Sequence, residues 1–173
     1  MSIWLVKHPR VLVDHTKCYG RSERALTDTF KEEVEAIKTK LPWIPDVVWT
    51  SPALRCQRTA VALGGVVKVD ERLEELNYGD WEGLSWKAIN RTECEKWQED
   101  PWTRRPPHGE SGEDLEQRVE KVRNEILRTV GQRKVVIVTH DGVLRVWRRL
   151  VEKKDRAAAV EWRMPCGTVR EMD

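Results

Sequence analysis

Short apolar runs alternate along this chain with longer segments in which apolar residues recur every three or four positions. The short runs are rich in β-branched residues and predict strands at 3–7, 46–50, 66–69 and 134–139, with an edge strand at 167–172. The longer segments predict helices at 27–41, 51–63, 85–99, 111–126, 143–152 and 157–162. Strands and helices therefore follow one another in turn.

Polar residues at the predicted helix starts support these boundaries. Thr27 precedes the first helical pattern and is expected to be its N-cap. Ser51 and Pro52 provide an N-cap and a proline at the first helical position of the second helix. Ser111 and Asp114 have the spacing of a capping box.

This order of elements predicts an α/β layered fold with a mostly parallel sheet and right-handed crossovers. A length of 173 residues fits one domain and leaves little room for two. No internal repeat, low-complexity tract or linker interrupts the chain. We therefore expect residues 1–173 to form a single domain.

Composition excludes several classes of protein. Hydrophobic residues make up 39% and charged residues 35%, which argues against a disordered chain, a collagen or a membrane span. The net charge is only +2, so composition does not indicate nucleic-acid binding.

The cysteines and the N-terminal residues bear on the compartment. Four cysteines occur without a CxxC pair, which argues against a zinc site. The apolar stretch near the N-terminus is too short for a signal peptide. We expect reduced thiols and a cytoplasmic protein.

Candidate chemistry lies where the predicted strands end. Active sites of open α/β sheets form outside the carboxyl ends of the strands. Lys7 and His8 end the first strand, and His140 follows the strand at 134–139. Arg55 lies in the first turn of the helix after the second strand. Two of only four histidines thus fall at strand ends.

This set of residues suits a phosphate group. A helix N-terminus presents free N–H groups, Arg55 adds a forked donor pair, and Lys7 adds a point charge. A neutral imidazole beside these cations is a plausible nucleophile, and a second imidazole stabilises the charge of the transferring oxygens. A proton donor for the leaving oxygen is still needed. Spacing alone leaves four candidates open: Glu71, Glu74, Glu75 and Glu82.

Five segments, in chain order, resemble the histidine phosphatase superfamily, which we assign to its phosphoglycerate mutase-like branch 2. They are LVKH at 5–8, SPALRCQRTA at 51–60, ERLEELNYGDWEG at 71–83, HGES at 108–111 and VTHDG at 138–142. Together they cover most of the chain. A further element, CYGRS at 18–22, resembles the segment typical of α-ribazole phosphatases.

The resemblance implies a fold and a role for each candidate residue. The implied fold is a three-layer α/β/α sandwich with helices on both faces of the sheet. His8 is the implied phosphorylated nucleophile, and Arg55 and His140 are implied to hold the phosphoryl group. Lys7 is expected to bind phosphate through its charge. Glu75 is selected as proton donor and later as base for water, a role that needs a raised pKa. No metal and no cofactor are implied, because the cations are built in.

Two positions depart from the family pattern. The family carries arginine before the nucleophile, where this chain has Lys7, which keeps the charge but not the bidentate fork. The family usually has glycine after the second histidine, where this chain has Asp141. An acid at that position either repels phosphate or points away from it.

The expected function is a metal-independent phosphomonoesterase that acts on a small-molecule phosphate ester through a phosphohistidine. The substrate stays open between α-ribazole 5′-phosphate and a broad range of small esters. A weakly active or inactive phosphate-binding homologue is one alternative, motivated by Lys7 and Asp141. Another is an RNA-binding or partner-binding domain that uses the basic run at 145–154. We expect a monomer or homodimer that contacts neither nucleic acid nor membrane.

Overall fold

The computed structural model describes residues 2–172, and its centre is one five-stranded sheet. The strands are β1 (Ser2–Lys7), β2 (Val47–Thr50), β3 (Val66–Val69), β4 (Lys134–Thr139) and β5 (Val169–Glu171). Their order across the sheet is β3-β2-β4-β1-β5. Strands β1 to β4 are parallel, whereas β5 pairs antiparallel with β1 at the edge. The predicted strands and the mostly parallel sheet are thereby confirmed.

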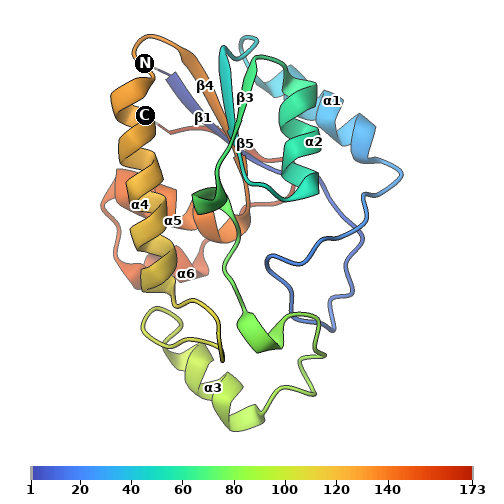
Figure 1. The fold of residues 1–173 in the computed structure, drawn as a ribbon, viewed down its shortest axis with the longest axis vertical. Helices are drawn as coiled ribbons and strands as arrows, with labels where there is room; N and C mark the ends of the chain where they lie inside the picture. The colour runs from blue at the N-terminus through green and yellow to red at the C-terminus, as the bar shows by residue number, and fades with distance from the viewer. Residues whose placement is uncertain (1, 173) are drawn as a thin grey trace.

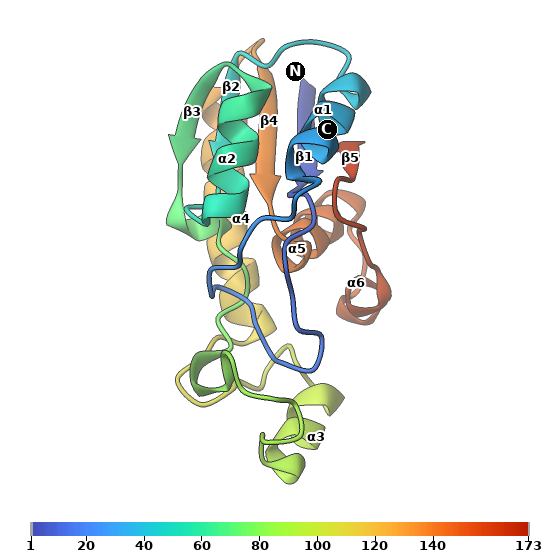
Figure 2. The ribbon, with the colours of Figure 1, turned by 90° about the vertical axis from the view of Figure 1, so that its right-hand side faces the viewer.

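Helices cover both faces of the sheet, as Figures 1 and 2 show. They are α1 (Phe30–Lys40), α2 (Leu54–Leu63), α3 (Arg91–Glu99), α4 (Gly112–Thr129), α5 (Asp141–Glu152) and α6 (Arg156–Glu161). Helices α1 and α2 lie on one face and α4 and α5 on the other, which gives the predicted three layers. Helix α3 lies apart from the sheet, at the opposite end of the molecule from the chain termini.

The two faces of the sheet are built by alternate residues of the same strands. In β4, Val136 and Val138 pack with α1 and α2, while Val135 and Ile137 pack with α4 and α5. This alternation is the period of two that a β-strand imposes on its side chains. Because β4 is the central strand and is buried on both faces, it is a continuous aliphatic run.

The strand register brings three chain segments together at the carboxyl end of the sheet. Lys7, the last residue of β1, pairs with Thr139, the last residue of β4, and Thr50 at the end of β2 pairs with Val138. The residues after these strand ends are fixed by further main-chain bonds. The amide of His8 donates to the Thr139 carbonyl at 3.2 Å, and that of Ser51 donates to the Val138 carbonyl at 3.2 Å.

Two predicted helix caps and one helix boundary are wrong. Ser51 does not cap α2, which begins three residues later after Ala53. Thr27 does not cap α1, because the helix begins after Thr29 and the Thr27 hydroxyl contacts the Arg10 carbonyl instead.

The helix predicted at 85–99 forms only from Arg91. Residues 85 and 86 pair with the 16–17 segment, only a single turn follows at Ser85, and Asn90 then caps α3. The capping box of Ser111 and Asp114 at the start of α4 is confirmed.

The single domain expected for residues 1–173 stays a prediction, and residues 1 and 173 lie outside the described part of the chain. Within residues 2–172, no helix is both long enough and apolar enough to cross a membrane.

Candidate active site

His8 and His140 face each other at the carboxyl end of the sheet, and Arg55 donates a hydrogen bond to each of them. Their ring centroids lie 5.2 Å apart with an interplanar angle of 67°. The Arg55 Nε donates to His8 Nε2 at 3.3 Å, and its Nη2 donates to His140 Nδ1 at 3.3 Å. The structure thus brings together the two strand-end histidines and the helix arginine that the sequence singled out. All three side chains are buried.

The hydrogen-bond partners fix the tautomers of both imidazoles. His8 Nδ1 lies 2.7 Å from the Pro9 carbonyl oxygen, which only accepts, so Nδ1 carries the proton. Its Nε2 faces Arg55, which only donates, and therefore presents a lone pair. In His140 the proton is on the other ring nitrogen, Nε2. Nδ1 accepts from Arg55, and Nε2 donates to the Ser51 hydroxyl oxygen at 2.8 Å.

Burial keeps both histidines neutral. Burial, with the charge of Arg55 as the next cause, lowers the pKa of His8 to about 3. Burial also lowers the pKa of His140 well below its usual value, and electrostatic interactions with His8 and Arg55 add to the effect. At neutral pH, His8 therefore has the form that a nucleophile needs.

The loop at 20–22 holds the Arg55 guanidinium in place. Arg55 donates to the Gly20 carbonyl at 2.9 Å and to the Ser22 carbonyl at 3.3 Å. Glu82 fixes this loop, because its carboxylate accepts from the Gly20 amide at 2.9 Å and from the Ser22 hydroxyl at 2.5 Å. Burial opposes the charge of Glu82, but the Ser22, Gly20 and Arg21 bonds outweigh it and lower its pKa. Glu82 is thus an ionised structural acid.

Glu75 has the opposite electrostatic setting. Its carboxylate accepts from the Gly142 amide in the first turn of α5 at 3.1 Å and from its neighbour Leu76 at 2.9 Å. Burial raises the pKa of Glu75 despite these bonds. Glu74, in contrast, forms an ion pair with Arg21 at 2.9 Å. The burial and raised pKa of Glu75 are what a proton donor needs.

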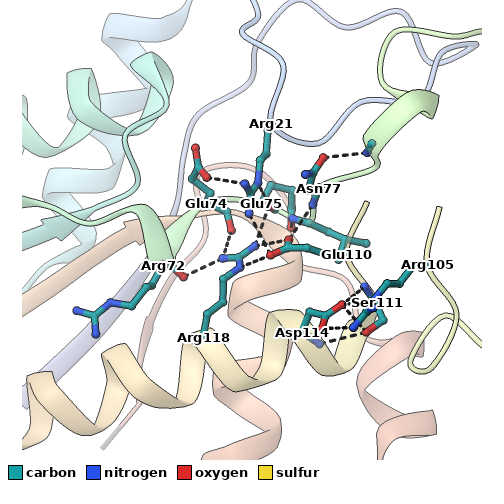
Figure 3. Close-up of polar contacts among 12 residues, drawn as sticks. Arg21, Arg72, Glu74, Glu75, Asn77, Arg105, Glu110, Ser111, Asp114 and Arg118 are labelled. Atoms are coloured by element: carbon teal, nitrogen blue, oxygen red, sulfur yellow. Dashed lines mark hydrogen bonds and ion pairs between the residues drawn. The ribbon is translucent and has the colours of Figure 1, made fainter. Parts of the chain in front are cut away.

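Arg118 on α4 anchors the backbone on either side of Glu75 (Figure 3). Its guanidinium donates to the carbonyls of Arg72, Glu74 and Glu75 at 2.8, 2.7 and 2.9 Å. It also forms a two-bond pair with the carboxylate of Glu110 at 2.9 Å. We did not single out Arg118 from the sequence. It lies three residues after Leu115 and one before Val119, so a charged residue on the buried stripe of the helix was the available signal.

Lys7 is directed elsewhere. Its ammonium lies 3.1 Å from the Asp141 carboxylate and 2.5 Å from the Met164 carbonyl oxygen. The predicted phosphate contact of Lys7 stays a prediction.

A cavity of about 240 Å³ opens over this arrangement. Its lining includes Ser51, Arg55, Glu74, Glu75 and His140, but neither His8 nor Lys7. A phosphoryl group here would meet a buried guanidinium, an imidazole and a carboxyl of raised pKa. Within residues 2–172, no three side chains of His, Cys, Asp or Glu are grouped to hold a metal ion. The metal-free site stays a prediction.

The model of one protein family matches nearly the whole chain. The model for the histidine phosphatase superfamily, branch 1, matches residues 3–173. The chain belongs to this superfamily. The resemblance is thereby confirmed, whereas the assignment to branch 2 is wrong, because the matching model is that of branch 1.

Curated relatives of this superfamily member include several phosphatases. The fructose-2,6-bisphosphatase of Saccharomyces cerevisiae is 32% identical over 150 residues, which are 83% of this chain and 32% of that protein. The adenosylcobalamin/α-ribazole phosphatase of Escherichia coli is 27% identical over 153 residues, which are 83% of this chain and 75% of that protein. The matched part of the Arabidopsis thaliana 6-phosphofructo-2-kinase/fructose-2,6-bisphosphatase, 31% identical, is only 17% of its length.

Solved structures agree with the fold. The α-ribazole phosphatase of Shigella flexneri superposes with a TM-score of 0.89 at 23% identity, over 100% of this chain and 90% of that one. A mycobacterial glucosyl-3-phosphoglycerate phosphatase in complex with VO3 superposes with a TM-score of 0.83 at 25% identity, over 98% and 91%. These likenesses establish the phosphoglycerate mutase-like α/β fold of the superfamily.

Proposed function

We propose that this protein is a metal-independent phosphomonoesterase that works through a phosphohistidine at His8. The observation that carries the proposal is the shared guanidinium: Arg55 bonds the free lone pairs of His8 Nε2 and His140 Nδ1 at the same time. When a phosphoryl group enters, its oxygens can accept charge-assisted hydrogen bonds from Arg55 in place of the two histidine nitrogens. The lone pair of His8 Nε2 is then free to attack phosphorus.

In the first step, His8 Nε2 attacks phosphorus and the bond between phosphorus and the ester oxygen breaks. Glu75 donates its proton to the departing oxygen, which leaves as an alcohol. Arg55 and His140 stabilise the charge on the transferring oxygens. Because His8 Nδ1–H donates a hydrogen bond to the Pro9 carbonyl oxygen, the imidazole keeps its orientation as Nε2 becomes phosphorylated.

In the second step, water attacks the phosphohistidine. The Glu75 carboxylate takes a proton from this water, the bond between nitrogen and phosphorus breaks, and inorganic phosphate leaves. Glu75 is again protonated and His8 again neutral, so the cycle closes.

For the substrate, we propose an ester similar to α-ribazole 5′-phosphate. Support comes from the Escherichia coli relative, whose printed activity is α-ribazole phosphatase, and from the element CYGRS at 18–22. That element supplies the Gly20 and Ser22 carbonyls that hold Arg55. A phosphatase of broad specificity is the second candidate, since the relatives also include fructose-2,6-bisphosphatases. A cytoplasmic location remains part of the proposal.

The test compares the wild type with His8→Ala in hydrolysis of p-nitrophenyl phosphate in the presence of EDTA. His15→Ala, at an exposed loop histidine, is the control. We expect turnover by the wild type and the control and a loss of at least about a hundredfold in His8→Ala. A rapid acid quench with radiolabelled substrate should recover phosphate bound to His8. Equal rates in all three proteins contradict the proposal, and vanadate binding without turnover indicates a phosphate-binding homologue.

A further inference from the structure

We call the cavity of about 240 Å³ over Arg55 and His140 the phosphate cavity. A second, larger cavity adjoins it and is lined by aromatic side chains. Its volume is about 530 Å³, within the range of small-molecule sites. Four of its lining residues are aromatic: Tyr78, Trp86, Trp97 and Trp102. They come from the segment that follows Glu75, from α3, and from the loop between α3 and α4. This is the part of the molecule that lies away from the sheet (Figure 1).

Glu75 lines both cavities, which connects the second one with the proposed reaction. If Glu75 gives its proton to the departing oxygen, the leaving group must begin next to its carboxyl. The phosphate cavity on one side of Glu75 is polar and contains Arg55 and His140. The aromatic cavity opens on the other side, where Gly142 adds no side chain. The leaving group of the ester therefore has this space available.

The aromatic side chains are arranged around the cavity edge to face. Tyr78 meets Trp86 with centroids 6.4 Å apart at 89° and meets Trp97 at 5.7 Å and 64°. Side chains that meet at such angles are not stacked face to face on each other. The buried Trp97 Nε1 has no hydrogen-bond partner in the described structure.

Charge argues against a second anionic group on the leaving group. The two arginines of this cavity, Arg145 and Arg163, both pair with Asp141, which lines it as well. The Asp141 carboxylate offsets part of their positive charge and repels a carboxylate or second phosphate, whereas a neutral leaving group meets no such repulsion.

We infer that the aromatic cavity binds a neutral, planar aromatic portion of the leaving group, joined to the phosphate through an aliphatic alcohol. This inference rests on the proposed phosphatase function and narrows its substrate class. It disfavours bisphosphates and phosphoglycerates, whose second anionic group would enter this cavity.

The test uses two esters with the same kind of leaving oxygen, 2-(1-naphthyl)ethyl phosphate and n-butyl phosphate. We expect the wild type to prefer the naphthyl ester by about a hundredfold in kcat/KM, since aromatic stacking contributes strongly per ring. Trp86→Leu should reduce this preference about tenfold, and Trp86→Phe should restore most of it. The matched control is Trp43→Leu, a half-buried tryptophan on the α1 side that also meets an aromatic neighbour edge to face, at 6.2 Å.

A binding measurement separates the inference from the proposed function. Titration with 2-(1-naphthyl)ethanol, the product alcohol, should show saturable binding that Trp86→Leu weakens and Trp43→Leu does not. Turnover of both esters without preference, and without binding of this alcohol, overturns the inference and leaves the phosphatase proposal intact. Binding of the alcohol without turnover of any ester contradicts the phosphatase proposal instead, while the aromatic site stands.

Discussion

The ammonium of Lys7 lies 3.1 Å from the carboxylate of Asp141, so the two residues that depart from the family pattern are partners of each other. Asp141 also pairs with Arg145 and accepts from the Met164 amide at 3.1 Å. Since Lys7 donates to the Met164 carbonyl as well, the pair ties β1 to the segment before β5. The acid does not face the phosphate cavity, whose lining includes neither residue.

This pairing predicts non-additive effects of substitution at the two positions. Lys7→Arg alone should change vanadate inhibition little, because Asp141 still holds the cation. Asp141→Asn should tighten vanadate binding by about three- to tenfold, because a negative charge near the site is removed and Lys7 is released. The double variant should bind tightest, with a coupling of about 0.5–3 kcal/mol. Strictly additive inhibition constants contradict the coupling.

Glu75→Gln should distinguish good from poor leaving groups. Without a proton donor, hydrolysis of an alkyl phosphate should fall about 10²–10⁴-fold, whereas p-nitrophenyl phosphate should be affected much less, because its leaving oxygen needs no proton. Glu74→Gln is the control, since the carboxylate of Glu74 lies next to Glu75 in the sequence and forms an ion pair with Arg21. In the wild type, kcat/KM for alkyl esters should fall as the pH rises through the raised pKa of Glu75. Equal losses with both esters would falsify the role of Glu75 as acid.

Gly142→Ala should affect Glu75 without unfolding the protein. A Cβ at this position would lie 2.3 Å from Glu75 Oε1, the mobile end of a side chain, so the carboxylate must move. We expect kcat for alkyl phosphates to fall at least about tenfold. The melting temperature should stay within a few degrees, because alanine suits the first turn of α5. A large drop in melting temperature, measured by circular dichroism, would instead indicate that the helix itself is disrupted.

The buried neutral state of His8 predicts acid-sensitive stability. The folded pKa of about 3 lies below the ordinary value of 6.5, so the unfolded chain takes up a proton first as the pH falls. The stability that His8 contributes is fully present above about pH 6.5 and is lost towards about pH 3.

Urea unfolding at about pH 7.5 and about pH 5.5 measures this contribution. The free energy of unfolding should decrease from about pH 7.5 to about pH 5.5, and this decrease should be about 1.4 kcal/mol smaller in His8→Gln than in the wild type. His15→Gln, at an exposed histidine, should leave the decrease unchanged. An identical decrease in His8→Gln contradicts a depressed pKa.

The sequence was sufficient to predict that His8, Arg55 and His140 meet. Parallel strands place their carboxyl ends at one edge, so short-range patterns that locate strands also locate the residues after them. The alternation of apolar runs was likewise enough to predict the layers of the fold. The α/β layered class follows from the order of elements along the chain, whereas the three-layer arrangement came from the family resemblance.

Contacts between distant segments were beyond that reasoning. Ser51 has the local pattern of a helix cap, yet its hydroxyl accepts from His140, because the register of β2 and β4 places the two residues together. Glu75 could not be separated from Glu74 and Glu82 by spacing, since burial and helix contacts distinguish them. The helix predicted at 85–99 began too early because pairing with residues 16–17 overrides local propensity.

The separation of α3 from the sheet has a consequence for how this architecture diversifies. His8 and His140, to which we assign phosphoryl transfer in our proposal, directly follow β1 and β4, whereas the tryptophans of the second cavity belong to residues 85–102. This excursion contributes no strand to the scaffold. In our proposal, replacing residues 85–102 by a different segment of similar length would change the selectivity for the leaving group and leave the reaction centre intact. Hydrolases of this fold can therefore diverge in substrate through this segment.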